Sequence, residues 1–175
     1  MKVYDTIGFD LMGMLVDDLV VVGAEPLFVT DYISCGHVDP EVIASIVKGI
    51  AQACQKAGCA LLGGETAEHP GLLAPDEFDV AGATTGVVER DEILGPERIA
   101  EGDALIAVAS SGLHSNGYSL VRHVLLEQAG WTLDRHVDEL GRTVGGELLE
   151  PTIVYAAGLL ALAHHSEVHA MCHVT

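Results

Sequence analysis

The chain has 175 residues, 49% of them apolar, so it is long enough to bury a hydrophobic core. Its 26 acidic and 8 basic residues give a net charge of -18, which argues against nucleic acid or an anionic membrane as a partner. A phosphate-bearing ligand would have to bring a cation such as Mg²⁺. The four cysteines lack the spacing of a disulfide framework or a zinc site, and neither a signal peptide nor a membrane span is predicted. We therefore expect a cytoplasmic protein.

Helix and strand patterns alternate through the first hundred residues. The capping residue Asp39 and the stop at Gly58 bracket a helix whose apolar stripe includes Cys54, which we expect in the core. The predicted elements, in chain order, are a helix over residues 7–22, a strand over 27–34, that helix over 40–57, and strands over 59–62 and 78–88.

A polar stretch with several turn residues, 94–102, separates these elements from the rest of the chain and predicts a domain boundary near residue 100. After it we predict a buried strand over 104–109, a helix that ends at Gly130, a polar connection or short helix over 136–149, a helix over 152–164 and a final strand over 168–174.

Two adjacent carboxylates stand on the first predicted helix. The helical wheel places Asp17 on the polar face and Asp18 among apolar residues, where an unpaired carboxylate is costly to desolvate. We therefore expect a partner for Asp18, and Mg²⁺ would serve because it prefers one or two carboxylates together with phosphate oxygens. A solvated helix face is an equally open explanation for Asp17.

Gly63, Gly64, Glu65 and Thr66 follow a predicted buried strand, where glycines permit close approach of a ligand and Glu65 can project into a cleft. Because similar sequences occur in ordinary turns, a turn is the favoured interpretation of this motif taken alone.

The segment Ser110–Gly117 lies between a predicted strand and a helix N-terminus, a place suited to binding phosphate. The alternative is that Ser115 or Asn116 only caps the helix, and both interpretations can hold together. His114 in this segment can donate to a phosphate or shuttle a proton. Four further histidines lack ligand-like spacing and are expected to be structural: His164, His165, His169 and His173.

Taken together, these motifs resemble the phosphoribosylformylglycinamidine cyclo-ligase family, also called aminoimidazole ribonucleotide synthetase or the PurM family. The matching segments are 5–8, 16–19, 23–28, 63–68, 70–71, 110–122 and 173–175. The resemblance implies a PurM-like α/β (α+β) fold. Residues 1–100 would be an N-terminal ATP-binding domain that forms a dimer β-barrel with helices, and residues 101–175 the beginning of a second α/β domain.

The resemblance also implies an ATP-dependent ligase of purine biosynthesis that closes the imidazole ring of aminoimidazole ribonucleotide. ATP phosphorylates the formamide oxygen of formylglycinamidine ribonucleotide, the amidine nitrogen attacks, and ADP and phosphate leave. In this comparison Mg²⁺ is held by Asp18 and Glu65, and ATP by these two residues with Gly63, Gly64 and Thr66. The substrate contacts would be Ser111, Gly112, Ser115 and Asn116, with His114 as the catalytic candidate and a homodimer formed through the N-terminal half.

Some features depart from the family. Its members carry a glycine-rich Asp-Gly-Val-Gly-Thr-Lys segment before the position of Met1 and continue past Thr175, so we expect a chain truncated at both ends with an incomplete ATP site and uncovered sheet edges. Tyr4 replaces a usual histidine, and Asp17 stands where many relatives have Asn, so Asp17 is not expected to be a primary ligand. Two alternatives remain: a non-catalytic fragment or dimerisation module, and another ATP-dependent small-molecule kinase or synthetase of the superfamily.

Overall fold

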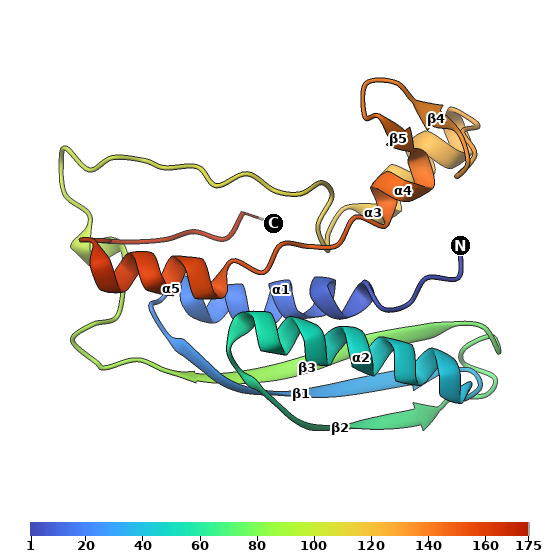
Figure 1. Cartoon of the computed structure of the whole chain (residues 1–175), viewed down its shortest axis with the longest axis horizontal. Helices are drawn as coiled ribbons and strands as arrows, with labels where there is room; N and C mark the ends of the chain where they lie inside the picture. The colour runs from blue at the N-terminus through green and yellow to red at the C-terminus, as the bar shows by residue number, and fades with distance from the viewer. Residues whose placement is uncertain (175) are drawn as a thin grey trace.

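Helices and strands alternate regularly in the first half of the chain, whereas short helices and irregular segments make up most of the second half. A computed structural model describes residues 1–174 (Figure 1). Its elements are α1 (Ile7–Val20), β1 (Glu25–Cys35), α2 (Pro40–Ala57), β2 (Ala60–Glu68), β3 (Phe78–Val87), η1 (Pro96–Arg98), α3 (Tyr118–Val121), η2 (Arg122–Gln128), β4 (His136–Val137), β5 (Arg142–Thr143), α4 (Val144–Leu148) and α5 (Ala156–His165). None of the described helices is long and apolar enough to cross a membrane.

The first three strands form one sheet in the order β2-β1-β3, with β1 parallel to β2 and antiparallel to β3. Both long helices, α1 and α2, cover the same face of this sheet (Figure 1). Side chains of α1, β1 and α2 meet in the core, which includes Met12, Val16, Val29, Ile33, Ile46 and Ile50. Along β3, residues alternate between half-buried and exposed, so the second face of the sheet is open in this chain.

Local sequence predicts α2 correctly. The Asp39 carboxylate accepts a hydrogen bond from the backbone N–H of Glu41 at 3.0 Å, and Gly58 ends the helix in the left-handed conformation with a φ of 77°. Cys54 is 2% exposed and belongs to the core, as predicted. The predicted strands that became β1 and β3 are also confirmed, with β1 longer by a few residues.

The two long helices cross closely because glycines stand at their contact. A Cβ atom built on Gly8 would lie 2.1 Å from the backbone nitrogen of Ile50, and one on Gly49 would lie 2.1 Å from the carbonyl oxygen of Asp5. Only hydrogen at these two positions allows α1 to approach α2 backbone to backbone. This contact sets how α1 is rotated about its own axis, and therefore on which side its polar side chains lie.

Several predicted boundaries are wrong by a few residues. The helix predicted to reach residue 22 ends at Val20, and the helix predicted from residue 152 begins at Ala156. Strand β2 runs to Glu68 because its parallel pairing with β1 continues through a bulge, so Gly63–Thr66 lies inside a strand and not at its end. The helix predicted up to Gly130 is present as α3, continued by the wider π-helical turns of η2.

Two predicted strands are absent from the described residues. The segments 104–109 and 168–174 contain no regular secondary structure, and Leu105 is fully exposed at 102% of its reference area. Figure 1 shows both segments on the side of α5 that faces away from the sheet. Apolar, β-prone composition predicts a strand, but a strand also requires a neighbour for its N–H and C=O groups. No strand among residues 1–174 pairs with either segment, although the His169 carbonyl accepts one backbone hydrogen bond from Gly95 at 3.1 Å.

Candidate functional site

The polar face of α1 binds the segment that leads into α5. Asp10 accepts two hydrogen bonds from Thr152, one from its backbone N–H at 3.1 Å and one from its hydroxyl at 2.6 Å. One turn further, Gly13 packs against the Thr152 methyl group, which leaves no room for a side chain on that glycine. The Asp17 carboxylate accepts from the backbone N–H of Tyr155 at 3.1 Å. This polar stripe is therefore an internal interface between distant parts of the chain.

The structure reverses the environments predicted for Asp17 and Asp18. Asp17 is buried, with 3% exposure, and burial raises its pKa to about 6 despite the hydrogen bond from Tyr155. The Asp18 side chain is 67% exposed. The helical wheel gave the angular positions correctly but could not show that the segment before α5 would supply N–H donors to Asp17.

Asp18 does have a partner, although not because it is buried. Its Oδ1 lies 2.9 Å from Nδ1 of His173, a residue 155 positions later in the chain. His173 was predicted to be merely structural, and its closeness to α1 was invisible in the sequence because no short-range spacing connects the two residues. The one available indication was the resemblance of the 173–175 segment to its family counterpart; Thr175 itself lies outside the described residues.

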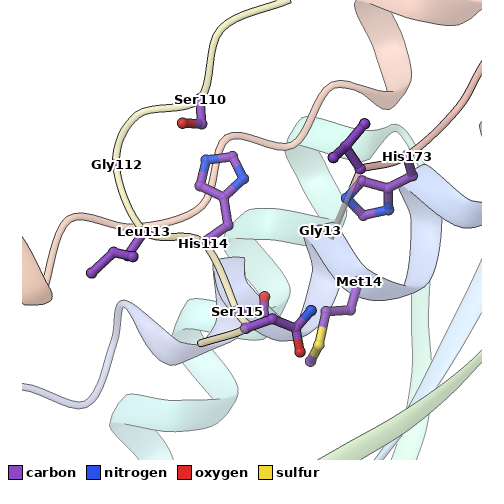
Figure 2. A pocket seen from close by; sticks show the side chains of 10 residues that line it. Gly13, Met14, Ser110, Gly112, Leu113, His114, Ser115 and His173 are labelled. Carbon is purple, nitrogen blue, oxygen red and sulfur yellow. The ribbon is translucent and has the colours of Figure 1, made fainter. Parts of the chain in front are cut away.

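A pocket of about 210 Å³ lies between α1, the loop that precedes α3, and the segment ending at His173 (Figure 2). Its lining consists of Gly13, Met14, Ser110, Gly112, Leu113, His114, Ser115, Asn116, His173 and Val174. No lining residue is a carboxylate, a lysine or an arginine, which is notable in a chain with a net charge of -18. The lining offers hydroxyl, amide and imidazole groups, which suit hydrogen bonding to an uncharged polar group of a small molecule.

Hydrogen bonds within the loop hold His114 in place. The backbone N–H of Ser111 donates to Nε2 of His114 at 3.2 Å, and the Ser111 hydroxyl lies 3.0 Å from the same nitrogen and 2.8 Å from the carbonyl oxygen of Pro151. Because an N–H can only donate, Nε2 is an acceptor and the proton of the neutral ring lies on Nδ1. Burial lowers the pKa of His114, which favours this neutral form.

The structure gathers the predicted substrate contacts at this pocket. Gly112, Ser115 and Asn116 line it beside His114, and the Ser115 hydroxyl donates to the backbone carbonyl of Asp10 at 2.9 Å. Ser111 stands behind His114 and orients its ring. Ser115 thus joins the loop to helix α1. The roles of Ser111, Gly112, Ser115 and Asn116 toward a substrate remain predictions.

Gly63, Gly64, Glu65 and Thr66 lie elsewhere. Glu65 pairs in register with Tyr32, whose neighbour Ile33 is buried under the helices, so Glu65 lies on the open face of the sheet. Asp18 stands in the helix layer on the opposite face, so a single chain does not bring Asp18 and Glu65 together. Residues 1–174 contain no cluster of three or more acidic, histidine or cysteine side chains suited to a metal ion.

Family models describe both parts of this arrangement. Residues 2–88 match the N-terminal domain of AIR synthase related proteins, and residues 100–175, which include the pocket loop and His173, match the C-terminal domain. The chain belongs to the AIR synthase related protein family. A phosphoribosylformylglycinamidine cyclo-ligase of Bacillus thuringiensis (strain Al Hakam) is 52% identical over 172 residues, and that of Bacillus anthracis is equally similar. The match covers 98% of this chain and 50% of each relative, so the chain spans about half the length of these AIR synthase relatives.

Solved structures of the same PurM-like fold are more distant. Thiamine monophosphate kinase of Aquifex aeolicus superposes with a TM-score of 0.60 and 17% identity, over 92% of this chain and 49% of the kinase. The hydrogenase maturation protein HypE of E. coli superposes with a TM-score of 0.61 and 21% identity, over 94% of this chain and 46% of HypE. These similarities establish the fold that the AIR synthase related family shares with them.

Proposed function

We propose that the protein takes part in ATP-dependent closure of the imidazole ring, converting formylglycinamidine ribonucleotide and ATP to aminoimidazole ribonucleotide, ADP and phosphate in the cytoplasm during purine synthesis. The observation that carries this proposal is the pocket formed by Ser110–Asn116, α1 and His173. Its uncharged donors and acceptors suit a small polar molecule, and the sequence is 52% identical to proteins named for this reaction.

The residues around the pocket would orient the substrate. Gly112 contributes backbone groups to the lining, and Ser115 and Asn116 present polar groups beside it. His114 presents Nδ1–H, because its Nε2 is occupied by the backbone N–H of Ser111. We assign to His114 the role of hydrogen-bond donor to the formamide oxygen, which holds this oxygen in place for phosphorylation by ATP. ATP would supply the phosphoryl group that turns this oxygen into a leaving group.

ATP and Mg²⁺ belong to the same proposal, with Asp18 as a candidate ligand in the helix layer and Glu65, with Gly63, Gly64 and Thr66, as candidates in β2. The two carboxylates do not form one centre within a single chain, so we assign no reaction step to the metal. Titration calorimetry with Mg²⁺-ATP tests each residue separately. Weaker binding in both Asp18→Ala and Glu65→Ala supports their roles, whereas unchanged affinity in either variant removes that residue from the site.

We also propose that residues 1–100 form the dimerisation domain and residues 101–175 belong to a second domain. Exposed side chains on the open face of the sheet support the first part; Ala81 and Ala83 lie on this face, midway along the edge strand β3. Ala83→Glu would place a charge in the proposed interface and is expected to yield monomers in analytical ultracentrifugation. Ala51→Glu, on the exposed side of α2, is the matched control. A dimer that persists in Ala83→Glu would exclude this face.

Turnover decides whether the chain acts alone. Cyclisation of formylglycinamidine ribonucleotide with ATP and Mg²⁺ should be compared between this chain and one extended at both ends to the length of its relatives. Activity in only the extended protein supports the proposed reaction and makes this chain a non-catalytic module, the alternative favoured by the segments 104–109 and 168–174, with which no described strand pairs. Lack of activity in both proteins would overturn the proposed reaction and point to another substrate.

A further inference from the structure

Two imidazole rings face the same pocket from different parts of the chain. His114 comes from the loop before α3, and His173 comes from the segment that follows α5. Figure 2 shows the rings on opposite sides of the pocket, each with one nitrogen turned toward the other ring. Such an arrangement can contact one ligand group from both sides.

The neighbours of each ring determine which nitrogen carries the proton. Nδ1 of His173 lies 2.9 Å from the Asp18 carboxylate, which can only accept, so this nitrogen is the donor. In the neutral ring Nε2 is then a free acceptor, and in Figure 2 it is the nitrogen directed toward His114. His114 presents a donor to the pocket, because its Nε2 accepts from Ser111 and its Nδ1 carries the proton. The pocket therefore has a fixed donor on one side and a fixed acceptor on the other.

We propose that His114 Nδ1–H and His173 Nε2 form a matched pair that binds the formamide group of the substrate. In a trans formamide the C=O and N–H bonds point in opposite directions, which fits partners on opposite sides of a pocket. The C=O accepts from His114 and the N–H donates to His173. His173 is thus a substrate-binding residue that selects for the formyl group, and Asp18 is a positioning residue that acts through His173. This inference rests on the proposed function.

The absence of charged lining residues supports this choice of group. A carboxylate or ammonium group would enter the pocket without a charged partner and would pay a desolvation cost that a formamide avoids. The ring of His173 is only 20% exposed, so its hydrogen bond with the substrate would be partly shielded from water.

Binding measurements on the chain test the pair with two substitutions that separate the ring nitrogens. In His173→Asn the amide nitrogen can replace Nδ1 toward Asp18 but leaves no acceptor in the pocket, whereas in His173→Gln an amide group reaches the position of Nε2. We expect the dissociation constant of formylglycinamidine ribonucleotide to rise about tenfold in His173→Asn and to change less than about threefold in His173→Gln. His165→Asn, on the exposed end of α5, is the histidine control.

Glycinamidine ribonucleotide, which lacks the formyl group, supplies the second half of the test. It should bind more weakly than the formylated ligand, and His173→Asn should leave its affinity unchanged. Equal affinity losses for both ligands would overturn formyl recognition and leave a structural role for His173. Affinity for the formylated ligand that is unchanged in His173→Asn overturns the inference while the proposed function stands. A wild-type chain that binds neither ribonucleotide overturns both.

Tautomers measured by ¹⁵N NMR give a readout that needs no ligand. Both His114 and His173 should carry the proton on Nδ1, the less common neutral form in water, whereas an exposed ring such as that of His165 should carry it mainly on Nε2. A proton on Nε2 of His173 in the free protein contradicts the proposed pair.

Discussion

The carboxylate of Asp17 lies 3.1 Å from the backbone nitrogen of Tyr155 and connects α1 to the start of α5 across 138 residues of sequence. Together with Asp10 and Thr152 it forms the polar contact that holds the second half of the chain against the first. The pocket lies directly beside this contact, because Gly13 of the same helix contributes to its lining. The stability of this contact and the shape of the candidate site are therefore linked.

Asp17→Asn should stabilise the protein at neutral and alkaline pH. The folded-state pKa of about 6 exceeds the ordinary value of 3.8, so folding favours the protonated form, and stability is lost as the pH rises through about 6. Asparagine keeps the acceptor for Tyr155 without the charge. We expect the free energy of unfolding at pH 8 to rise by up to about 3 kcal/mol, with little difference below pH 4. Urea denaturation at both pH values measures this, and Asp76→Asn, at an exposed position, is the control.

Asp10→Ala should destabilise the chain by about 2–4 kcal/mol, because it leaves the N–H and hydroxyl of the buried Thr152 without their acceptor. Asp10→Asn keeps one acceptor oxygen at the same place and should cost less than half as much. Chemical denaturation of the three proteins at pH 7 gives the comparison. Equal losses in the alanine and asparagine variants would show that these hydrogen bonds do not hold the two halves together.

Gly8→Ala should destabilise by about 2 kcal/mol or more, because its methyl group would meet the backbone of Ile50 and push α1 away from α2. Gly158→Ala is the matched change, since Gly158 lies within α5 with no atom near its added methyl group. There alanine should stabilise by about 1 kcal/mol through its higher helix propensity. Thermal melting of both variants tests whether the close helix crossing exists in solution.

Hydrogen exchange should distinguish the segment 104–109 from a true strand. Its amides have no backbone partner among the described residues, so we expect exchange near the rate of an unstructured peptide. Amides of Val29 and Ile33, in the central strand β1, should be strongly protected. Protection of residues 104–109 comparable to that of β1 would mean that the segment pairs with a strand in solution.

Local chemistry explains why some elements were predictable. The cap at Asp39, the helical spacing of apolar residues and the left-handed stop at Gly58 all lie within a few residues of α2, so α2 was predicted correctly. Segment 104–109 has an equally clear apolar pattern, but a strand forms only against a neighbour, and no neighbour is encoded locally. The prediction was wrong for that reason.

The same division applies to the candidate site. The sequence by itself indicated the loop Ser110–Gly117 and the family motif that contains it. Only the tertiary structure decided that Asp17 is buried while Asp18 is exposed, that Glu65 lies on the far face of the sheet, and that His173 shares a pocket with His114. Motifs depend on residues adjacent in the chain, whereas burial and pairing depend on which distant segments pack together, and here the crossing of α1 with α2 and the docking of residues 152–156 made that choice.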